Sequence, residues 1–405
     1  MIPMNQRLHI GHFTNTYHPL VSGVTRSVSN FRRGLTELGH NVFVFAQQDD
    51  DYVDEEPFIF RYPAFNLPLM SNFPLNIPFS PFIDKVLPYL KLDIIHSHHP
   101  FLLGQTAIHK SEELNLPLVF TYHTRYQEYS HYIPLSQEFV KETIGRWVGE
   151  YMEQCHHIIV PSQSIKELLF EEYGLCDQIT VVQTGIDLTP YQNGDSSAVR
   201  RQQGWNEDIV LISIGRMAEE KNWKLLLEAA ALVMRGREDI RLVLIGDGDD
   251  REALEHYAAD LGIAEKTEFT GSLPFEDVPR YLSAADIFCF ASVTETQGLV
   301  TMEAMAAGLP VAAVDASGTR DVIEHGTEGF LSKNESEALA QEINRLIQDE
   351  ALRHCFGEAA WQKAQTFTMT HQAEKLIPVY EQAREDKLAE RFVKIDKEKA
   401  VFTMV

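Results

Sequence analysis

Hydrophobic and polar positions along the chain follow a repeated pattern. Short runs rich in β-branched or aromatic residues alternate with longer amphipathic runs, which is typical of β-α-β units and parallel sheets. In the first half we expect strands at residues 8–14, 41–47, 93–96, 117–123, 156–161 and 179–182. A second series follows at residues 209–214, 241–245, 267–270, 286–290 and 310–314. The pattern predicts an α/β protein with two doubly wound parallel sheets.

Amphipathic runs between the expected strands predict helices. They include residues 24–38, 164–173, 223–235 and 251–261. Ser164 and Glu167 have the spacing of a capping box at the start of one of these helices. Residues 335–394 are also helical by pattern and have no strand signal, so we expect them to pack on the sheets.

A polar segment rich in helix breakers, residues 189–206, separates the two series. We therefore place the domains at residues 1–195 and 196–365. Residues 366–405 are expected to form C-terminal helices that cross back to the first domain, followed by a tail. Residues 57–88 depart from the alternation because prolines at this density interrupt regular helices and central strands. This apolar segment suits either a lip for a lipid or a buried irregular loop.

Composition narrows the function classes. A chain of 405 residues with 44% hydrophobic content is too large for one ordinary core. It has no uncharged apolar run of about 18 residues and no signal-peptide pattern, so we expect a cytoplasmic protein. The formal net charge of −24 argues against nucleic-acid binding. Four scattered cysteines fit a reducing compartment and are expected to be packing residues.

The stretch "TETQGLVTMEAMAAGLPV", residues 294–311, follows an expected strand and opens a helix. The N–H groups of Gly298, Leu299 and Val300 at the helix start predict an anion site, since ligands of such folds bind beyond the carboxyl ends of the strands. Glu303 leans back toward that first turn and suits a ribose diol. Glu295 lies in the preceding loop, where it suits contact with whatever is attached beyond the phosphates. Both carboxylates also fit the simpler role of favouring the helix dipole.

A pair of cations follows another expected strand. Arg216 and Lys221 come after residues 209–214 and suit the clamping of a diphosphate, although such a pair is also common on a solvated surface. Residues 244–250 lack the spacing G-x-G-x-x-G, so we interpret them as a turn and helix cap. The loop at residues 17–25, which contains Gly23, is a second candidate for a close backbone approach to phosphate.

Histidines gather at the expected strand ends of the first domain. His96, His98 and His99 lie near one another in the sequence, but no neighbouring Cys or H-E-x-x-H partner supports zinc, so we expect no metal site. His123 follows the strand at 117–123 and fits either a functional role or an ordinary core or loop role.

With these residues assembled, the chain resembles the retaining GT-B glycosyltransferases, a large family that includes sucrose synthases, bacterial mannosyltransferases and diacylglycerol glucosyltransferases. The most specific feature is the E-x7-E spacing of Glu295 and Glu303. Residues 215–216 with Lys221, the loop at 22–24, His123 and residues 161–162 and 184–187 support it. Ser22 departs from the family, which commonly has glycine there. Gln297 stands where phenylalanine is common but is similar to the lipid glucosyltransferase branch, as are residues 99–104.

The resemblance implies a GT-B fold of two Rossmann-like domains that face a cleft, the first binding the acceptor and the second the nucleotide sugar. Arg216 and Lys221 would hold the donor diphosphate, and Glu303 the ribose. Gly23 and the amides of Gly298, Leu299 and Val300 would contact the phosphates and sugar. His123 and Glu295 would contact the transferred hexose. These roles make His123, Glu295, Arg216 and Lys221 the expected catalytic residues, with no metal or other cofactor.

The implied reaction is the transfer of a hexose, UDP-hexose being the favoured donor, to a diacylglycerol-type lipid with retention of configuration. The alternative acceptor is a soluble sugar, sugar phosphate or polysaccharide. A nucleotide-sugar epimerase and a non-catalytic nucleotide-sugar-binding regulator are weaker alternatives. Peripheral membrane contact would be local, through residues 57–88, through Arg26, Arg32 and Arg33, or through the tail at 387–405.

Overall fold

The computed structural model describes most of the chain as two compact units. The described residues are 7–20, 22–49, 51–65, 75–76, 79–128, 136–191, 196–205, 207–396 and 400–401. The first unit comprises Met1–Gly185 and Met369–Val405, and the second comprises Ile186–Thr368. The first boundary lies before the expected position at residue 195. Ile186 belongs to the second unit because its N–H donates to the Phe367 carbonyl at 2.7 Å.

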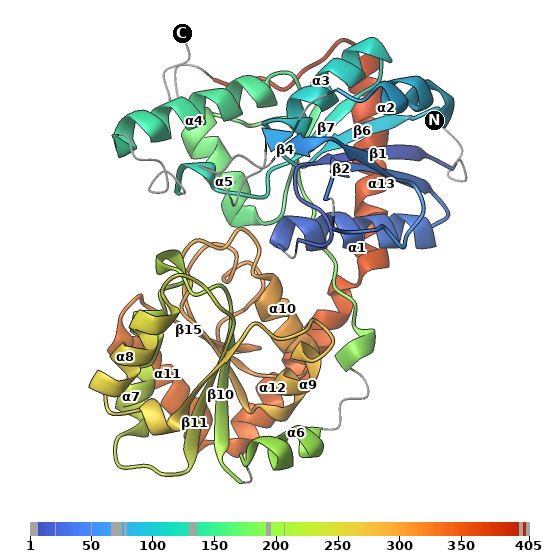
Figure 1. Ribbon diagram of the computed structural model, residues 1–405. Helices are drawn as coiled ribbons and strands as arrows, with labels where there is room; N and C mark the ends of the chain where they lie inside the picture. The colour runs from blue at the N-terminus through green and yellow to red at the C-terminus, as the bar shows by residue number, and fades with distance from the viewer. Residues whose placement is uncertain are drawn as a thin grey trace. The chain divides into compact units, whose positions relative to one another are not determined.

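The first unit is built on a seven-stranded sheet in the order β3-β2-β1-β6-β7-β8-β9, in which all pairings are parallel. Figure 1 shows this sheet in the blue to green part of the ribbon. Its strands are β1 (His9–Thr14), β2 (Asn41–Gln47), β3 (Ile59–Tyr62), β6 (Ile94–Ser97), β7 (Leu118–Thr121), β8 (His157–Val160) and β9 (Ile179–Val181). The six strands predicted for this half are confirmed, and β3 was missed.

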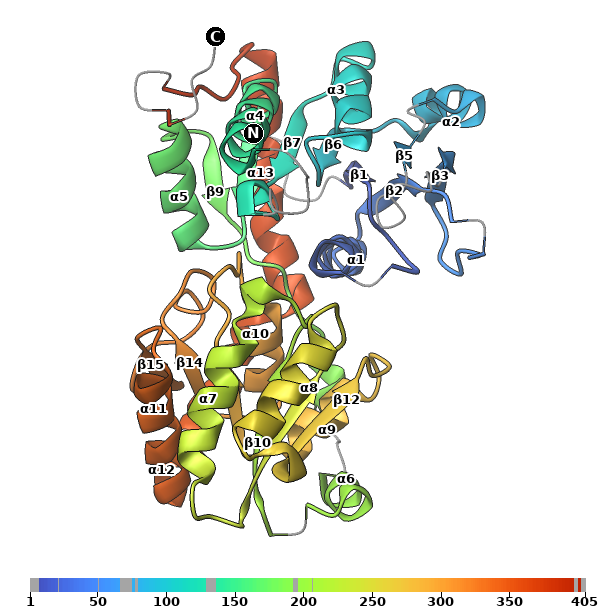
Figure 2. The same ribbon diagram turned by 60° about the vertical axis from the view of Figure 1, so that its left-hand side comes forward.

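Helices cover both faces of the first sheet, because its strands carry apolar side chains on both sides. On one face pack α2 (Pro81–Val86), α3 (Leu103–Glu113), α4 (Gln137–Met152) and α5 (Gln163–Tyr173). On the other face pack α1 (Gly23–Glu37) and α13 (Met369–Leu388). Figures 1 and 2 both show α13 passing beside α1, so the C-terminal helix completes the core of the first unit.

The proline-rich segment contains more regular structure than expected. β3 is an edge strand, where proline neighbours are tolerated. Pro81 stands in the first turn of α2, where its missing N–H costs no hydrogen bond, and the Ser80 hydroxyl caps that helix. The prediction of no regular helix at 57–88 was therefore wrong. A short hairpin, β4 (Ala64–Phe65) with β5 (Leu75–Asn76), and the 3-10 helix η1 (Leu87–Leu90) complete it. Residues 66–74 and 77–78 of this segment lie outside the described residues.

The second unit is built on a six-stranded parallel sheet in the order β12-β11-β10-β13-β14-β15. Its strands are β10 (Ile209–Ile214), β11 (Ile240–Ile245), β12 (Thr267–Gly271), β13 (Ile287–Phe290), β14 (Val311–Val314) and β15 (Gly329–Ser332). The five strands predicted for this half are confirmed, and β15 was missed. The strand order reverses between β10 and β13, which makes the loops after these two strands the expected ligand site.

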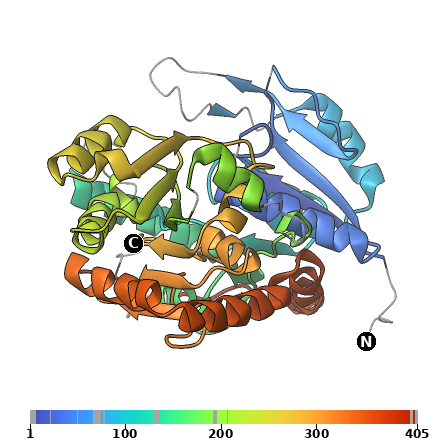
Figure 3. The ribbon, with the colours of Figure 1, turned by 90° about the horizontal axis from the view of Figure 1, so that it is seen from below.

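Helices also cover both faces of the second sheet, as Figure 3 shows from below. One face is packed against α7 (Trp223–Met234), α8 (Arg251–Asp260) and α11 (Ser336–Gln348). The other is packed against α6 (Ser196–Gln203), α9 (Val278–Ala284), α10 (Leu299–Ala306) and α12 (Glu350–Ala364). The predicted helices at 24–38, 164–173, 223–235 and 251–261 correspond to α1, α5, α7 and α8.

The capping box predicted for α5 was wrong. Ser162, two residues earlier than Ser164, is the N-cap, and its hydroxyl accepts from the Ile165 N–H. Ser162 has the extended backbone of an N-cap, whereas Ser164 lies inside the first turn. The pattern located the helix but not its first residue.

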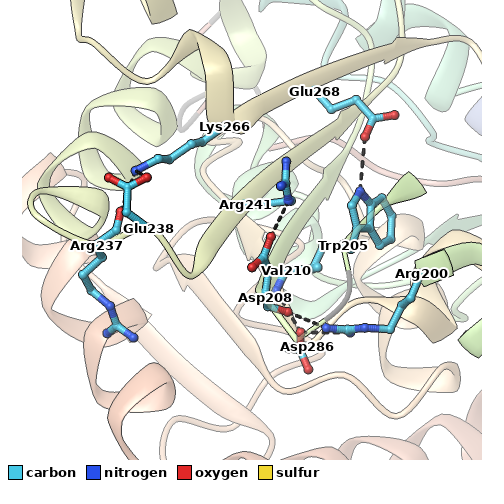
Figure 4. A network of polar contacts seen from close by, with 10 residues as sticks. All are labelled: Arg200, Trp205, Asp208, Val210, Arg237, Glu238, Arg241, Lys266, Glu268 and Asp286. Atoms are coloured by element: carbon cyan, nitrogen blue, oxygen red, sulfur yellow. Dashed lines mark hydrogen bonds and ion pairs between the residues drawn. The ribbon is translucent and has the colours of Figure 1, made fainter. Parts of the chain in front are cut away.

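Charged side chains connect the amino ends of neighbouring strands in the second unit through hydrogen bonds and ion pairs (Figure 4). The Asp286 carboxylate accepts from the Val210 N–H at 2.8 Å and from Arg200 Nη1 at 3.2 Å. Arg241 Nε donates to Asp208 at 2.5 Å, and Arg200 also donates to the Asp208 carbonyl. These contacts lie at the opposite ends of the strands from the loops where ligands bind, so we assign them to stability.

All four cysteines are free thiols. Cys155 and Cys289 are buried among apolar side chains, as predicted for packing residues, whereas Cys176 and Cys355 are exposed. Within the described part of the chain, no helix has the length and apolar character needed to span a bilayer.

Candidate active site

The loop after β10 places the two predicted cations at the switch point of the second sheet. β10 ends at Ile214, and Arg216 follows two residues later. The Trp223 indole N–H donates to the Arg216 carbonyl at 2.9 Å and so ties this loop to the first turn of α7. The Arg216 side chain is half exposed and forms an ion pair with Glu220. Its backbone is fixed, while its guanidinium remains at the surface.

Lys221 ends the 3-10 helix η4 (Glu219–Lys221), and α7 begins two residues later. Asn222 joins the two helices with a left-handed backbone, φ +57°. Its side-chain amide donates to the Ala291 carbonyl at 3.1 Å and to Asn334 Oδ1 at 2.8 Å. Asn222 therefore ties the loop after β10 to the loop after β13, and this positions Lys221 for contact with the second loop.

The side chains of Lys221 and Glu295 meet directly. Lys221 Nζ lies 2.5 Å from Glu295 Oε1, and the Ser292 hydroxyl donates to the same oxygen at 2.8 Å. Burial alone would raise the pKa of the Glu295 carboxyl, but the Lys221 ammonium and the two hydrogen bonds outweigh it, so the pKa is lowered. Glu295 is therefore an anion at neutral pH, held in a fixed position by groups from two loops.

Gly318 shapes the Glu295 loop from a third segment. Its φ is +76°, and a Cβ added there would lie 2.7 Å from the Glu295 carbonyl oxygen and 2.9 Å from the Gln297 nitrogen. The Ser317 hydroxyl donates to the same Glu295 carbonyl at 3.0 Å. Only glycine combines this backbone conformation with such a close approach. The sequence pattern did not indicate roles for Gly318, Ser317, Ser292 and Asn222, and the only signal among them was a glycine in a turn.

The predicted anion site lies at the start of α10. Gly298 is its N-cap, with φ +79°, and the helix begins at Leu299. The first N–H groups of a helix have no partner inside the helix, and they carry its positive dipole end. Gly298, Leu299 and Val300 therefore offer donors to an anion. The expectation that they contact donor phosphates stays a prediction.

Glu303 is almost completely buried in α10, one turn after Leu299. A buried carboxylate is costly unless it is hydrogen-bonded or paired, so a plain role as a solvated dipole charge does not explain this position. Its predicted contact with a ribose is consistent with the burial and stays a prediction. The predicted turn at residues 244–250 is confirmed, and Gly246 and Gly248 pack directly on the backbone of Gly215 and Met217. Asp250 stands at the N-cap position of α8, but its side chain makes no capping hydrogen bond, so the predicted side-chain cap was wrong.

Two predicted site residues lie in the first unit. Gly23 begins α1 directly after the cap residue Ser22, whose hydroxyl accepts from the Thr25 N–H at 3.1 Å. A Cβ added at Gly23 would meet nothing within 4 Å, so packing within the described chain does not require glycine there. His123 follows β7, and its Nε2 lies 2.8 Å from Nδ1 of His98. Each unit thus supplies its own set of predicted residues at the carboxyl ends of its strands.

The first unit also shows where the proposed lipid-facing groups lie. Phe58, Phe79 and Phe82 expose 54%, 60% and 66% of their surface, so the segment at 57–88 carries large apolar side chains at the surface. Arg32 is paired with Glu56 and Arg33 with Glu37, which makes these two arginines part of the unit's own ion pairs. In the tail, Val393 and Ile395 are buried in the core. Residues 397–399 and 402–405 lie outside the described part of the tail.

Comparison with known proteins identifies the family. Residues 21–190 match the family described as Glycosyltransferase Family 4, and residues 195–363 match Glycosyl transferases group 1. The alpha-monoglucosyldiacylglycerol synthase of Acholeplasma laidlawii is 32% identical over 81% of this chain and 86% of its own length. This chain is a GT-B glycosyltransferase.

Further similarities agree with this assignment. The alpha-monoglucosyldiacylglycerol synthase of Streptococcus pneumoniae R6 is also 32% identical, over 76% of this chain and 71% of its own length. The crystal structure of Anabaena Alr3699/HepE in complex with UDP matches with a TM-score of 0.73. That match has 21% identity and covers 92% of this chain and 99% of the other, so it supports the GT-B fold.

Proposed function

We propose that this glycosyltransferase moves a hexose from a UDP-hexose to a diacylglycerol-type lipid and retains the anomeric configuration. The observation that carries the proposal is the 32% identity, over most of both chains, to a protein named as an alpha-monoglucosyldiacylglycerol synthase. The alternative acceptor, a soluble sugar, sugar phosphate or polysaccharide, has no comparable support from the site described above.

The arrangement of the second unit supports transfer from a nucleotide sugar. When the bond between sugar and diphosphate breaks, negative charge grows on the diphosphate. Arg216, Lys221 and the N-terminal amides of α10 supply positive groups at the carboxyl ends of β10 and β13. We propose that these groups stabilise the leaving diphosphate without a metal ion, and that Glu303 binds the ribose.

The ion pair of Lys221 and Glu295 suggests how the diphosphate and the hexose of the donor are held in fixed relative positions. We propose that Lys221 contacts the diphosphate while its partner Glu295 accepts hydrogen bonds from hydroxyls of the transferred hexose. Because Ser292, Ser317 and Gly318 all hold the Glu295 loop, the carboxylate is preorganised for one sugar orientation. We further propose that His123 and Gly23 contact the donor from the first unit.

The acceptor proposal has a second support in the first unit. Phe58, Phe79 and Phe82 each expose more than half of their surface, and exposed aromatic side chains of this size can be buried at the boundary of a membrane. We propose that this segment gives peripheral contact with the cytoplasmic face of a membrane. The strong overall acidity means that such contact depends on local apolar burial rather than on general electrostatic attraction.

A transfer assay tests the proposal. Purified protein would be incubated with radiolabelled UDP-glucose, UDP-galactose or GDP-mannose and with vesicles that contain diacylglycerol, and the products would be partitioned between organic and aqueous phases. We expect label in the organic phase with a UDP-hexose. Label only in the aqueous phase, with a soluble acceptor present, would overturn the lipid assignment.

Two further readouts test the mechanism. The anomeric coupling constant of the isolated glycolipid distinguishes retention from inversion, and inversion would overturn the retaining proposal. Transfer in the presence of EDTA is expected to continue, whereas loss of activity that added Mg²⁺ or Mn²⁺ restores would show a metal requirement. Lys221→Ala serves as the inactive control for contaminating transferases.

A further inference from the structure

Three histidines of the first unit form a continuous chain of hydrogen bonds. His12 Nδ1 lies 2.7 Å from His98 Nε2, and His98 Nδ1 lies 2.8 Å from His123 Nε2. His12 lies in the second half of β1, and His98 and His123 follow the carboxyl ends of β6 and β7, the strands that come next in the sheet. The chain therefore crosses the point where the strand order of the first sheet reverses.

Each of these imidazoles is neutral and carries one N–H. Burial, with a smaller contribution from the Arg32 charge, lowers the pKa of His12 to about 3. Burial and the neighbouring histidines hold the pKa of His98 well below its ordinary value, and burial lowers the pKa of His123 to about 3. A neutral imidazole donates through one nitrogen and accepts through the other. Two bonds in series therefore allow only two proton arrangements, one donating toward His123 and one donating toward His12.

The far nitrogen of His12 selects between these arrangements. His12 is completely buried, and its Nε2 has no hydrogen-bond partner among the described residues. If the chain donated toward His12, this nitrogen would carry a buried N–H without an acceptor, which is a rare and costly state. If the chain donates toward His123, the same nitrogen carries only a lone pair.

We propose that His12 and His98 are positioning residues that fix His123 in the tautomer with its proton on Nδ1. In this arrangement His12 Nδ1–H donates to His98 Nε2, and His98 Nδ1–H donates to His123 Nε2. His123 is left with Nδ1–H as its donor. The functional consequence rests on the proposed function, in which His123 contacts the transferred sugar: a fixed donor selects a sugar oxygen as its acceptor.

A metal site is the competing use of the same cluster. Ligand atoms of His12, His96 and His98 lie within 4.8 Å of one another, and all three residues are buried. However, both nitrogens of His96 are already bonded, to Tyr380 Oη at 2.9 Å and to Thr121 Oγ1 at 2.6 Å. The rings of His12 and His98 lie nearly parallel, with an interplanar angle of 15°, and Nδ1 of His12 is already joined to Nε2 of His98 by the 2.7 Å hydrogen bond. The geometry favours the hydrogen-bonded chain.

Nitrogen NMR of the full chain tests the tautomer. In protein labelled with ¹⁵N-histidine, long-range ¹H–¹⁵N correlations distinguish the protonated from the unprotonated ring nitrogen, and the loss of one spin system in His123→Gln assigns His123. We expect protonated Nδ1 and unprotonated Nε2 in the wild-type protein at pH 7.5. Protonated Nε2 on His123 in the wild-type protein would overturn the proposal, with His123→Gln needed only to assign the signal.

Two substitutions at position 98 test whether the chain sets this state. His98→Leu removes the donor to His123, and we expect His123 to shift toward the Nε2–H tautomer. The side-chain amide in His98→Asn can place an N–H near the position of the lost Nδ1–H, so we expect it to restore the wild-type tautomer. His96→Gln changes a ring beside the chain but outside it, and it is expected to leave the tautomer unchanged. An unchanged tautomer in a folded His98→Leu protein would overturn the proposal.

Kinetics and metal content complete the test. We expect His98→Leu to lower kcat/KM about tenfold, the equivalent of about one hydrogen bond, with most of the loss recovered in His98→Asn. If no sugar transfer occurs at all, the proposed function fails, while the NMR result still decides the tautomer. If the purified protein contained stoichiometric zinc, and His12→Gln lost it, the proposed hydrogen-bonded histidines would be wrong and the cluster would be a metal site.

Discussion

Lys221 and Glu295 are 74 positions apart in the sequence, yet Nζ of one lies 2.5 Å from Oε1 of the other. The pair joins the loops after β10 and β13, the two strands at which the order of the second sheet reverses. An ion pair in this place orients both side chains before any ligand arrives. It also means that neither side chain can be replaced without leaving the other as a partly buried charge.

Lys221→Ala is expected to reduce kcat/KM for transfer by about 100-fold or more, because one fixed donor to a developing anion commonly accounts for this much. The measurement is initial-rate kinetics with the donor identified by the transfer assay. Lys266→Ala is the matched control: it removes a lysine of the same unit from an ion pair with Glu238 at 2.9 Å. Equal losses in the two variants would show that the effect is general destabilisation.

Gly318→Ala is expected to impair transfer by displacing the Glu295 loop, since the added methyl would lie within 3 Å of three atoms of that loop. We expect a fall in kcat/KM with the fold retained. The measurements are transfer kinetics and circular dichroism.

Gly236→Ala is the control that distinguishes the steric clash at position 318 from the cost of a left-handed backbone. Gly236 has φ +73°, close to the +76° of Gly318, but a Cβ there would meet nothing within 4 Å. Both substitutions therefore share the cost of a left-handed backbone, about 1 kcal/mol. If both variants keep wild-type kcat/KM, Gly318 does not position Glu295.

These residues also mark the limit of what the sequence predicts. Long apolar runs such as those of β2 and β10 were found because a strand buried on both faces needs continuous hydrophobic residues. β3 and β15 were missed because their flanking residues are untypical of strands, prolines beside β3 and charged residues beside β15. Their place at the edges of the sheets depends on neighbouring strands, which local pattern does not show.

The candidate site likewise has features that the sequence predicted and features that it did not. Arg216, Lys221, Glu295 and Gly298 were predicted because each stands at the end of a recognisable strand or the start of a helix. The direct pairing of Lys221 with Glu295 was not predicted, since it depends on which strands are neighbours. Gly318 contributes through contact with a segment more than 20 positions away, and a glycine in a polar turn has the same local appearance with or without that contact.

Asp286→Ala is expected to lower the free energy of unfolding by about 1–3 kcal/mol, because it leaves the Val210 N–H without its acceptor and removes the carboxylate that pairs with Arg200. Urea unfolding measures the change. Transfer per folded molecule should remain at the wild-type level, since Asp286 lies at the amino ends of the strands.

Asp239→Ala is the matched control for Asp286. Asp239 pairs with Arg237 at the surface of the same unit, and its side chain is 56% exposed. An exposed pair contributes little, so we expect a change below about 1 kcal/mol. The interpretation of the network in Figure 4 is that Asp286 stabilises the unit through its contact with the backbone. A loss of stability in Asp239→Ala as large as in Asp286→Ala would contradict it.

The buried histidines predict that the first unit loses stability in mild acid. Burial is the largest cause of the lowered pKa of His12, to about 3, and of His96 and His98, which are held well below the ordinary value. In the unfolded chain these rings take up protons as the pH falls below about 6.5, whereas in the folded unit they stay neutral. Their contribution to stability is therefore complete above about pH 6.5 and is lost as the pH falls toward the folded pKa.

One carboxyl acts in the opposite direction. Burial raises the pKa of Glu172 to about 7, so the folded state binds this proton first and gains stability between about pH 7 and the ordinary pKa of glutamate. The stability gained from Glu172 offsets the stability lost through only one of the buried histidines. The remaining rings still give a net loss of up to about 1.4 kcal/mol per pH unit for each histidine below pH 6.

Hydrogen exchange between pH 7.5 and pH 5, corrected for the intrinsic rate, measures this loss in each unit separately. We expect protection of β1, β6 and β7 to fall with pH more steeply than protection of β10, β11 and β13. In His12→Gln, which cannot take up the proton in either state, the dependence in the first unit should become shallower. A parallel fall in both units, unchanged in His12→Gln, would show that the acid sensitivity comes from groups other than the histidine cluster.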